Sequence, residues 1–270
     1  MALRLIVTRP AAQAADWVRQ LIALGLQADA LPLIGIAPVA DSAPLIAAWQ
    51  SLSGYRLVVF VSPNAVQRFF VAAPAPATWP RGVLAGSTGP GTTAALRQVG
   101  VPAADIIEPA AEPAQFDSEA LWAQLQTMDW AAQRVLVVRG EGGRDWLAEA
   151  LRGRGAQLDF LAAYRRTPPL LDAAGHALLA AACSHPSQHL WLFSSSESVG
   201  WLRTLAPAAD WSPGQALASH PRIVQAARGL GFGQVLLTAP TAHAVAQAVA
   251  GLGAHGSHVH AFGAQGPSIE

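Results

Sequence analysis

The chain has 270 residues, of which 52% are hydrophobic and only 13% are charged, and its formal net charge is zero. This length fits one large domain or two of ordinary size, and the apolar content is enough for two cores. Proteins that bind nucleic acids normally carry a basic excess, so the neutral balance argues against a polyanionic polymer as partner.

The single cysteine, Cys183, excludes a disulfide framework or a thiolate metal site within the chain. It lies in the apolar run Ala177–Cys183 and is expected to be a buried core thiol. The opening segment MALRLIVTRP has an apolar run too short for a signal peptide, and no stretch reaches the length of a membrane span. These features predict a soluble, cytoplasmic protein.

Segments typical of strands and of helices alternate along the chain. The apolar runs LVVFV, RVLVV and LWLF are typical of strands buried on both faces. Gly25, Gly100, Gly155 and Gly231 follow helical patterns and are predicted to end them. The alternation favours an α/β fold with parallel sheets and helices on both faces. The predicted helices span residues 11–24, 42–53, 63–72, 91–99, 117–128, 144–153, 172–183, 197–205, 221–230 and 241–252, and residues 253–270 are predicted to be a disordered tail.

The beginning of the chain is repeated in its second half. Arg4–Arg9 (RLIVTR) resembles Arg134–Arg139 (RVLVVR). Each copy has the pattern of a strand, an amphipathic helix, a stop at glycine and a second extended segment. We therefore expect two similar α/β halves, with the chemistry in the cleft between them. At the same offset Gly25 corresponds to Gly155, Asp29 to Asp159, and Pro38 to Pro168.

The loops that follow the strands are candidate ligand sites, because open parallel sheets bind ligands beyond the carboxyl ends of their strands. Most of these loops are rich in Ser, Thr or Gly and open a helix. Such turns expose backbone N–H groups at a positive helix end, which suits anions. Each loop alone also has a structural interpretation, since these residues are ordinary caps and turns. The candidate substrate contacts are Arg9, Ser62, Pro63, Asn64, Ser87, Thr88, Gly89, Arg139, Gly140, Glu141, Ser194, Ser195, Ser196 and His220.

The sequence contains no recognisable nucleotide or metal motif. Gly86–Gly91 lacks the Gly-x-Gly-x-x-Gly spacing, and no Gly-Lys-Ser/Thr occurs. Pro186 interrupts the helical spacing of His185 and His189. No Gly-x-Ser-x-Gly elbow is present either. The sequence therefore predicts neither a cofactor nor a metal.

The strand ends resemble those of uroporphyrinogen-III synthases over about residues 3–250. The order and spacing of five segments carry the resemblance. They are Val7–Pro10 (VTRP), Phe60–Val66 (FVSPNAV), Val137–Arg144 (VVRGEGGR) with Leu147 after it, Tyr164–Arg166 (YRR) followed by prolines, and Phe193–Ser195 (FSS).

The resemblance implies two similar flavodoxin-like, doubly wound parallel-sheet domains joined by a two-stranded extended linker. Leu31–Pro38 and Leu161–Pro168 are the paired extended segments of the repeat, so they are the expected crossings. A monomer is implied by the resemblance alone. The first domain would comprise residues 1–35 plus 169–252, the second residues 39–160, and the linker strands residues 36–38 and 161–168.

The resemblance also implies an activity. The family cyclises hydroxymethylbilane, a linear tetrapyrrole, to uroporphyrinogen III, with inversion of the fourth ring, loss of water and no cofactor or metal. The substrate is flexible, rich in carboxylates and able to close spontaneously without inversion, so the task is mainly one of positioning. Hydroxymethylbilane synthase, which acts upstream, is a candidate partner.

Departure of the substrate hydroxyl needs an acid, and Tyr164 is the tyrosine that matches the family. The alternative is a tyrosine that only packs in the linker. Arg9 and Arg139 occupy equivalent positions of the repeat, and each either binds a carboxylate or supports its loop.

The chain departs from the family at one turn. Many members have a Gly-Pro-Thr-Thr-like turn where this chain has Ser219–Ile223, and the threonine pair occurs instead as Thr92-Thr93. A hydroxyl role at the first place is thereby in doubt, although His220 could substitute as a donor.

A second hypothesis is a non-catalytic, two-lobed binding protein for a small polycarboxylate ligand. Duplication and a hinged cleft fit it equally well, although such receptors are usually exported. A third is a domain cut from a larger fusion, with the tail as a trimmed linker.

Overall fold

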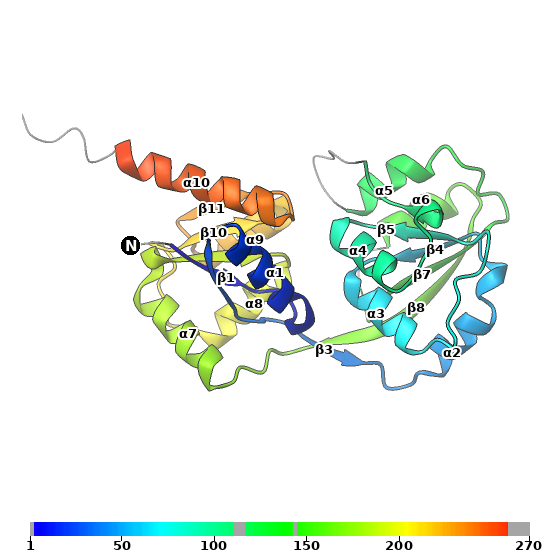
Figure 1. Cartoon of the computed structure of the whole chain (residues 1–270), viewed down its shortest axis with the longest axis horizontal. Helices are drawn as coiled ribbons and strands as arrows, with labels where there is room; N and C mark the ends of the chain where they lie inside the picture. The colour runs from blue at the N-terminus through cyan, green and yellow to red at the C-terminus, as the bar shows by residue number, and fades with distance from the viewer. Residues whose placement is uncertain (1–2, 111–116, 143–144, 259–270) are drawn as a thin grey trace, which may run out of the picture. The chain divides into compact units, whose positions relative to one another are not determined.

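The computed structural model describes residues 3–110, 117–142 and 145–258. The chain divides into two compact units, which are shown in Figure 1. Unit 1 consists of Met1–Leu33 and Leu171–Glu270, and unit 2 of Ile34–Leu170. Each unit has a sheet of its own, so the fold is α/β in both.

The sheet of unit 1 has five strands in the order β11-β10-β9-β1-β2, and every neighbouring pair is parallel. Numbered by their order within the unit, the strands run 2-1-3-4-5, which is the flavodoxin-like doubly wound order. Leu5, Ile6 and Val7 of β1 are fully buried, as expected for an inner strand of such a sheet. The bounds are β1 Arg4–Val7, β2 Gln27–Ala30, β9 His189–Phe193, β10 Gln215–Ala218 and β11 Gln234–Leu237.

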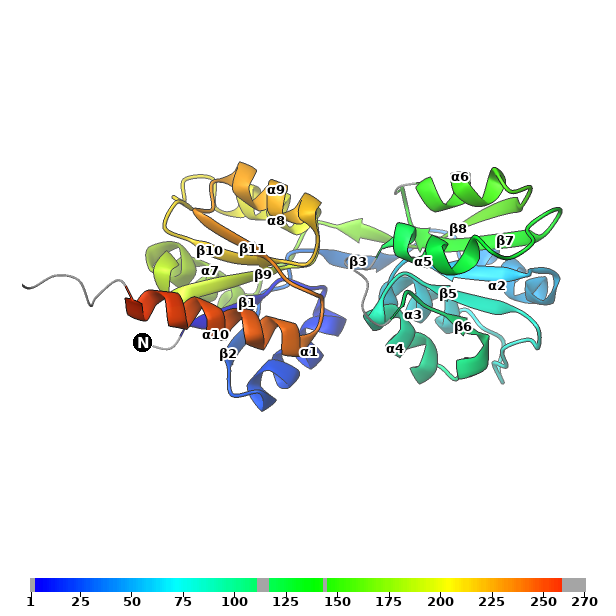
Figure 2. The ribbon, with the colours of Figure 1, turned by 90° about the horizontal axis from the view of Figure 1, so that it is seen from above.

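Helices cover both faces of this sheet, and Figure 2 shows α1 and α10 on the side opposite to α8 and α9. Leu21 of α1 and Val245 of α10 pack in one apolar cluster. Leu202 of α8 and Ala227 of α9 pack in the other, together with Leu179 of α7. The bounds are α1 Ala11–Ala23, α7 Ala173–Ser184, α8 Ser196–Leu205, α9 Pro221–Leu230 and α10 Ala242–His258.

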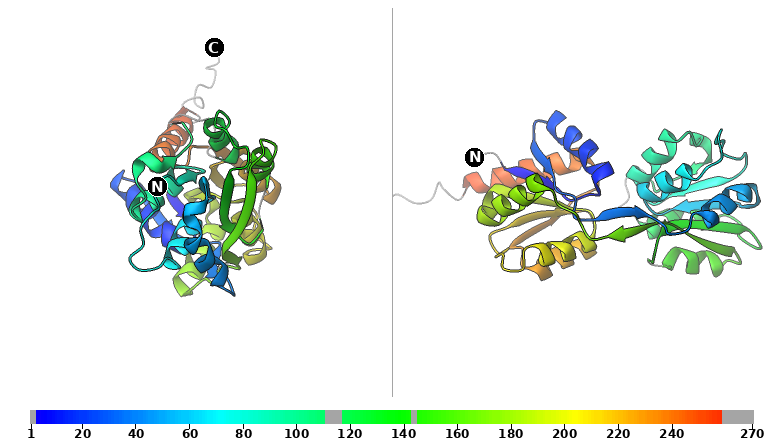
Figure 3. Two further views of the ribbon diagram at one scale, coloured as in Figure 1. Left: turned by 90° about the vertical axis from the view of Figure 1, so that its right-hand side faces the viewer. Right: turned by 90° about the horizontal axis from the view of Figure 1, so that it is seen from below.

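The sheet of unit 2 has six strands in the order β3-β8-β7-β4-β5-β6. Its strands from β8 to β6 are parallel and repeat the order of unit 1 in permuted chain order. The edge strand β3 pairs antiparallel with β8, and the two lie side by side in Figure 3. The bounds are β3 Gly35–Pro38, β4 Leu57–Phe60, β5 Leu84–Ser87, β6 Ile106–Ile107, β7 Arg134–Gly140 and β8 Gln157–Thr167.

Two apolar clusters also flank the sheet of unit 2. Trp49 of α2, Phe69 of α3 and Leu96 of α4 belong to one cluster. Leu121 of α5 and Leu151 of α6 belong to the other. The bounds are α2 Ala43–Gln50, α3 Pro63–Val71, α4 Pro90–Gln98, α5 Ser118–Leu125 and α6 Trp146–Arg152.

The predicted linker strands, residues 36–38 and 161–168, are grouped with unit 2. The reason is the ladder between β3 and β8, in which Ile36 is opposite Arg166 and Pro38 is opposite Tyr164. Residues 161–167 are also the continuation of β8, which pairs with β7 from Gln157 to Tyr164.

Each predicted helix has a counterpart, and the largest difference lies at the C-terminal end. Helix α10 extends to His258, so the prediction of a disordered tail from residue 253 is corrected for residues 253–258. Three preceding helical turns carry the helix through Gly253 and Gly256, because helix propagation is cooperative and no proline interrupts it. The rest of the predicted tail, residues 259–270, lies outside the described residues.

The repeat seen in the sequence is the unit β1-α1-β2, which recurs as β7-α6-β8. Gly25 and Gly155 follow the two helices with φ of +81° and +87°, a left-handed conformation that favours glycine. The repeat includes an ion pair between the two strands of each copy. It joins Arg4 to Asp29 in unit 1 and Arg134 to Asp159 in unit 2.

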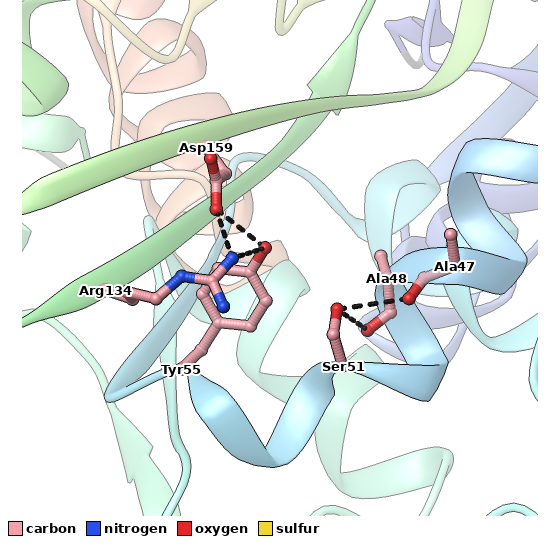
Figure 4. Close-up of polar contacts among 6 residues, drawn as sticks. All are labelled: Ala47, Ala48, Ser51, Tyr55, Arg134 and Asp159. Atoms are coloured by element: carbon pink, nitrogen blue, oxygen red, sulfur yellow. Dashed lines mark hydrogen bonds and ion pairs between the residues drawn. The ribbon is translucent and has the colours of Figure 1, made fainter.

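In unit 2 a tyrosine joins this ion pair, as Figure 4 shows. The Tyr55 hydroxyl donates to Asp159 Oδ2 at 2.8 Å and accepts from the Arg134 guanidinium at 3.0 Å. The guanidinium also lies 4.3 Å from the centre of the Tyr55 ring. These contacts lower the pKa of Asp159, first through the hydrogen bond from Arg134 and then through the one from Tyr55.

Among the helices within the described residues, none combines the length and the apolar character that a bilayer crossing requires.

Candidate functional site

The candidate residues follow the carboxyl ends of strands, where α/β sheets bind ligands. The strand order reverses between β1 and β9 in unit 1 and between β4 and β7 in unit 2, so these are the two switch points. The residues fall into two sets, one per unit, and the predicted cleft between the units stays a prediction. The set in unit 1 is Arg9, Ser194, Ser195, Ser196 and His220, and the set in unit 2 is Ser62, Pro63, Asn64, Ser87, Thr88, Gly89, Arg139, Gly140, Glu141 and Tyr164.

Tyr164 is buried in the core of unit 2, with 1% of its surface exposed. Its hydroxyl lies 3.0 Å from the Ser62 hydroxyl. Ser62 Oγ also accepts a hydrogen bond from Ala65 N at 3.2 Å and so caps α3. Tyr164 therefore connects β8 to the turn that follows β4.

Gly140 makes room for the Tyr164 ring. A Cβ added at Gly140 would lie 2.8 Å from the ring, closer than real Cβ contacts come. The next residue, Glu141, has an exposed side chain and donates its backbone N–H to Tyr164 O at 2.9 Å. The glycine at the end of β7 is thus required by the packing of Tyr164.

The turn after β5 uses its hydroxyl groups internally. Ser87 is fully buried, and its hydroxyl donates to Gly89 O at 2.8 Å. The same oxygen accepts from Thr93 Oγ1 at 2.9 Å. The structural interpretation therefore fits Ser87 and Thr93 better, while Thr88 beside them is half-buried.

Arg139 in β7 is neutralised within unit 2. Its guanidinium forms an ion pair with Asp145, the residue before α6. It also lies 4.5 Å from the centre of the Phe160 ring. Both a carboxylate and an aromatic face already contact this arginine.

Arg9 in unit 1 follows the inner strand β1. The preceding residue, Thr8, is buried and donates its hydroxyl to Leu192 O at 2.8 Å, which fixes β1 against β9. The Arg9 guanidinium lies 4.2 Å from the centre of the Trp17 ring, and its Nε is buried without a hydrogen-bond partner in the described part of the chain. Desolvation by burial lowers the pKa of Arg9 to about 10.

Side chains cap the two helices that follow β9 and β10. Ser195 Oγ accepts from Glu197 N at 3.1 Å at the start of α8, between the half-buried Ser194 and the exposed Ser196. His220 Nδ1 accepts from Arg222 N at 3.1 Å at the start of α9.

In the part of the chain that the structure describes, no three His, Cys, Asp or Glu side chains gather in a group that could hold a metal ion.

Three partners of the arginines were not found from the sequence. Trp17 is the surface on which Arg9 lies, and Phe160 and Asp145 contact Arg139. Trp17 lies in the amphipathic helix that follows Arg9, eight positions further along the chain. Its place among the apolar residues of that helix predicts packing in the core and not a contact with an arginine. Asp145 lies in the first turn of the helix predicted over residues 144–153 and could have been recognised as a counter-ion at a helix N-terminus.

The fold and the site define a class of protein: two flavodoxin-like units whose strand ends carry hydroxyl- and glycine-rich turns suited to an anionic small molecule. The family model described as "Uroporphyrinogen-III synthase HemD" matches residues 15–247. The chain belongs to the uroporphyrinogen-III synthase family, and it is an enzyme of tetrapyrrole biosynthesis.

Individual relatives agree with this membership. The uroporphyrinogen-III synthase of Salmonella typhimurium is 31% identical over 175 residues, which cover 64% of this chain and 69% of the relative. A mutant uroporphyrinogen III synthase of Thermus thermophilus has a similar fold, with a TM-score of 0.57 and 16% identity over 95% of this chain and 100% of the other. The Helicobacter pylori enzyme gives a TM-score of 0.56 and 12% identity over 93% and 100%.

Proposed function

We propose that this chain converts hydroxymethylbilane to uroporphyrinogen III, closing the macrocycle with inversion of the fourth ring and loss of water. The family match over residues 15–247 is the observation that carries the proposal. The turns after the strands support it, because exposed backbone N–H groups at helix starts suit the carboxylates of a tetrapyrrole.

The reaction makes two demands on the protein. A proton from an acid or from solvent converts the hydroxyl of the hydroxymethyl group to water, the carbon–oxygen bond breaks, and a cationic azafulvene remains on the first ring. The substituted carbon of the fourth ring then attacks this methylene and gives a spiro intermediate. This intermediate rearranges to the inverted ring and releases one proton. The protein must hold the two chain ends together and stabilise the developing positive charge.

Positioning is the larger demand, because the free substrate already closes without inversion. An enzyme that fixes the direction of attack changes the product isomer even without a strong acid. Half-buried Thr88 and Ser194 are proposed as neutral donors to the substrate. Tyr164 and Ser62 are proposed to keep the turn after β4 in place, since both hydroxyls are already engaged with each other.

The substrate must come from an enzyme that joins pyrrole units into a linear hydroxymethyl tetrapyrrole. We propose hydroxymethylbilane synthase as that upstream enzyme and the cytoplasm as the location. Both parts rest on the family and on the sequence prediction. No observation favours the alternative of a non-catalytic polycarboxylate-binding protein.

The proposal is tested by supplying hydroxymethylbilane to the purified chain and separating the oxidised product isomers by chromatography. We expect uroporphyrin III as the main product. Formation of isomer I alone, at the rate seen without protein, would exclude the synthase activity and favour a binding protein.

A further inference from the structure

Two arginines occupy corresponding positions of the internal repeat. Arg9 follows β1, the strand at the switch point of unit 1, and Arg139 lies near the end of β7, the corresponding strand of unit 2. The sequence leaves the same two alternatives open for both, a carboxylate contact or support of the loop. Their surroundings differ, and the difference separates a structural arginine from one that is built to receive a ligand.

Arg139 has a carboxylate partner within unit 2. Its guanidinium pairs with the Asp145 carboxylate, which stands immediately before α6, and its flat face lies over Phe160. The Asp145 carboxylate therefore lies next to a cation and to the positive end of a helix, and both stabilise its negative charge. Unit 2 thus contains its own example of a carboxylate bound at the end of this strand.

Among the described residues, Arg9 has no such counter-ion. The ion pairs among the described residues do not include it, and its only hydrogen bond within them is a long one of 3.4 Å from Nη1 to Gln13 Oε1. Its Nε is buried and has no acceptor among the residues that the structure describes. A guanidinium has five N–H donors, so within this part of the chain most of them have no partner. A cation withdrawn from water without a carboxylate destabilises the folded chain unless a ligand supplies one.

The surroundings of Arg9 favour an anion. Helix α1 begins at Ala11, two residues after Arg9, and its N-cap residue, Pro10, has no side-chain oxygen to accept from the N–H groups of Ala11 and Ala12. The next N–H group, that of Gln13, donates to Pro10 O at 2.8 Å. The N–H groups of Ala11 and Ala12 and the helix dipole attract negative charge. The Trp17 ring holds the guanidinium from one side, which leaves its edge for a bidentate partner. The position that Asp145 fills in unit 2 has no acidic counterpart in unit 1, where Ala15 corresponds to it in the repeat.

We propose that Arg9, and not Arg139, binds a carboxylate of the substrate, together with the first-turn N–H groups of α1. This inference rests on the proposed function, because it takes hydroxymethylbilane as the source of the carboxylate. Arg139 is a structural residue whose anion site is occupied by Asp145.

The test compares Arg9→Met with Arg9→Lys. Methionine keeps an unbranched apolar side chain against Trp17 and removes the charge, whereas lysine keeps the charge and loses the planar fork. We expect Arg9→Met to raise KM for hydroxymethylbilane at least tenfold, and Arg9→Lys to raise it less. We also expect the melting temperature of Arg9→Met to stay equal or to rise, because an unpaired buried cation is removed.

Arg19→Met is the matched control, since Arg19 is an exposed arginine of the same helix, paired with Asp16. It should leave KM unchanged. Arg139→Met should lower the melting temperature, because it removes the cation that pairs with the Asp145 carboxylate. An unchanged KM in Arg9→Met, or a fall in its melting temperature with no KM effect in Arg9→Lys, would overturn the proposal.

A binding arm separates this inference from the proposed function. Benzenehexacarboxylate, a polycarboxylate probe without the pyrrole chemistry, is titrated into each variant by calorimetry. Weaker binding by Arg9→Met than by Arg19→Met supports the carboxylate site even if the chain forms no isomer III. Equal binding by both variants contradicts it even if the chain is an active synthase.

Discussion

Tyr164 is the residue for which burial matters most. The sequence leaves open whether it is the acid of the reaction or a packing residue. Its ring lies in the core cluster of unit 2, and its hydroxyl faces the Ser62 hydroxyl at 3.0 Å. Because only 1% of the residue's surface is exposed, its phenol acts more readily on the turn it touches than on a substrate. We therefore assign it a positioning role.

Tyr164→Phe should slow turnover by about fivefold, in line with the roughly 1 kcal/mol that one hydrogen bond contributes. Ser62→Ala should act similarly, and the double variant should be less than additive, because both changes break the same contact. Single-turnover kinetics with separation of the product isomers checks this. A loss beyond about a thousandfold in Tyr164→Phe alone would identify the tyrosine as the essential acid.

Two glycines offer a second prediction at the scale of single residues. Gly140→Ala should destabilise the chain by about 1–3 kcal/mol, because the new Cβ would lie 2.8 Å from the buried Tyr164 ring. Gly200→Ala, in the exposed face of α8 with nothing within 4 Å, should stabilise it by about 0.5–1 kcal/mol. Urea titrations measure both. Equal effects of the two substitutions would contradict the packing described for Tyr164.

At the scale of elements, the repeat preserves an ion pair that joins two neighbouring parallel strands. The pair in unit 2, Arg134 with Asp159, is half-exposed, so its contribution is modest after screening by solvent. Tyr55 strengthens it by donating to the same carboxylate oxygen. This network lies at the amino ends of the strands, opposite the candidate site, so its role is stability.

The lowered pKa of Asp159 predicts a pH dependence of stability. A depressed pKa in the folded state means that the contribution is present above the unfolded pKa of about 3.9 and is lost as the pH falls through the folded value. Asp159→Asn should therefore lower the free energy of unfolding by about 0.5–1 kcal/mol at pH 7 and by less below about pH 4. Tyr55→Phe should give part of this effect. Denaturant titrations at several pH values check this prediction. A difference in the free energy of unfolding between wild type and Asp159→Asn that stays the same at every pH would refute it.

The elements were the most predictable level of the structure. Gly25, Gly155 and the buried runs of β4, β7 and β9 are strong local signals, so alternation, helix positions and parallel sheets follow from the sequence. The end of α10 was not predictable, because Gly253 and Gly256 are residues that commonly end a helix, and here the helix continues through both. The site was predictable only as a set of loops. The difference between Arg9 and Arg139 depends on their contacts with Trp17 and Asp145, respectively, which are visible only in the folded structure.

At the scale of the whole molecule, each unit has its own sheet and two apolar clusters. Unit 2 is one continuous segment, Ile34–Leu170, so it can be expressed alone. We expect this segment to fold cooperatively, with native near-UV circular dichroism from its buried Trp49, Trp79 and Trp130. Helical far-UV signal without near-UV signal would show that its core needs the rest of the chain.

The central claim is that the chain directs the closure of a linear tetrapyrrole. Enzymatic and spontaneous closure compete for the same hydroxymethylbilane, so the isomer ratio depends on the protein concentration. We predict that the fraction of isomer III rises from zero toward completeness as protein is added at fixed substrate. An isomer III fraction that stays at zero across the whole range of protein concentration would contradict the account.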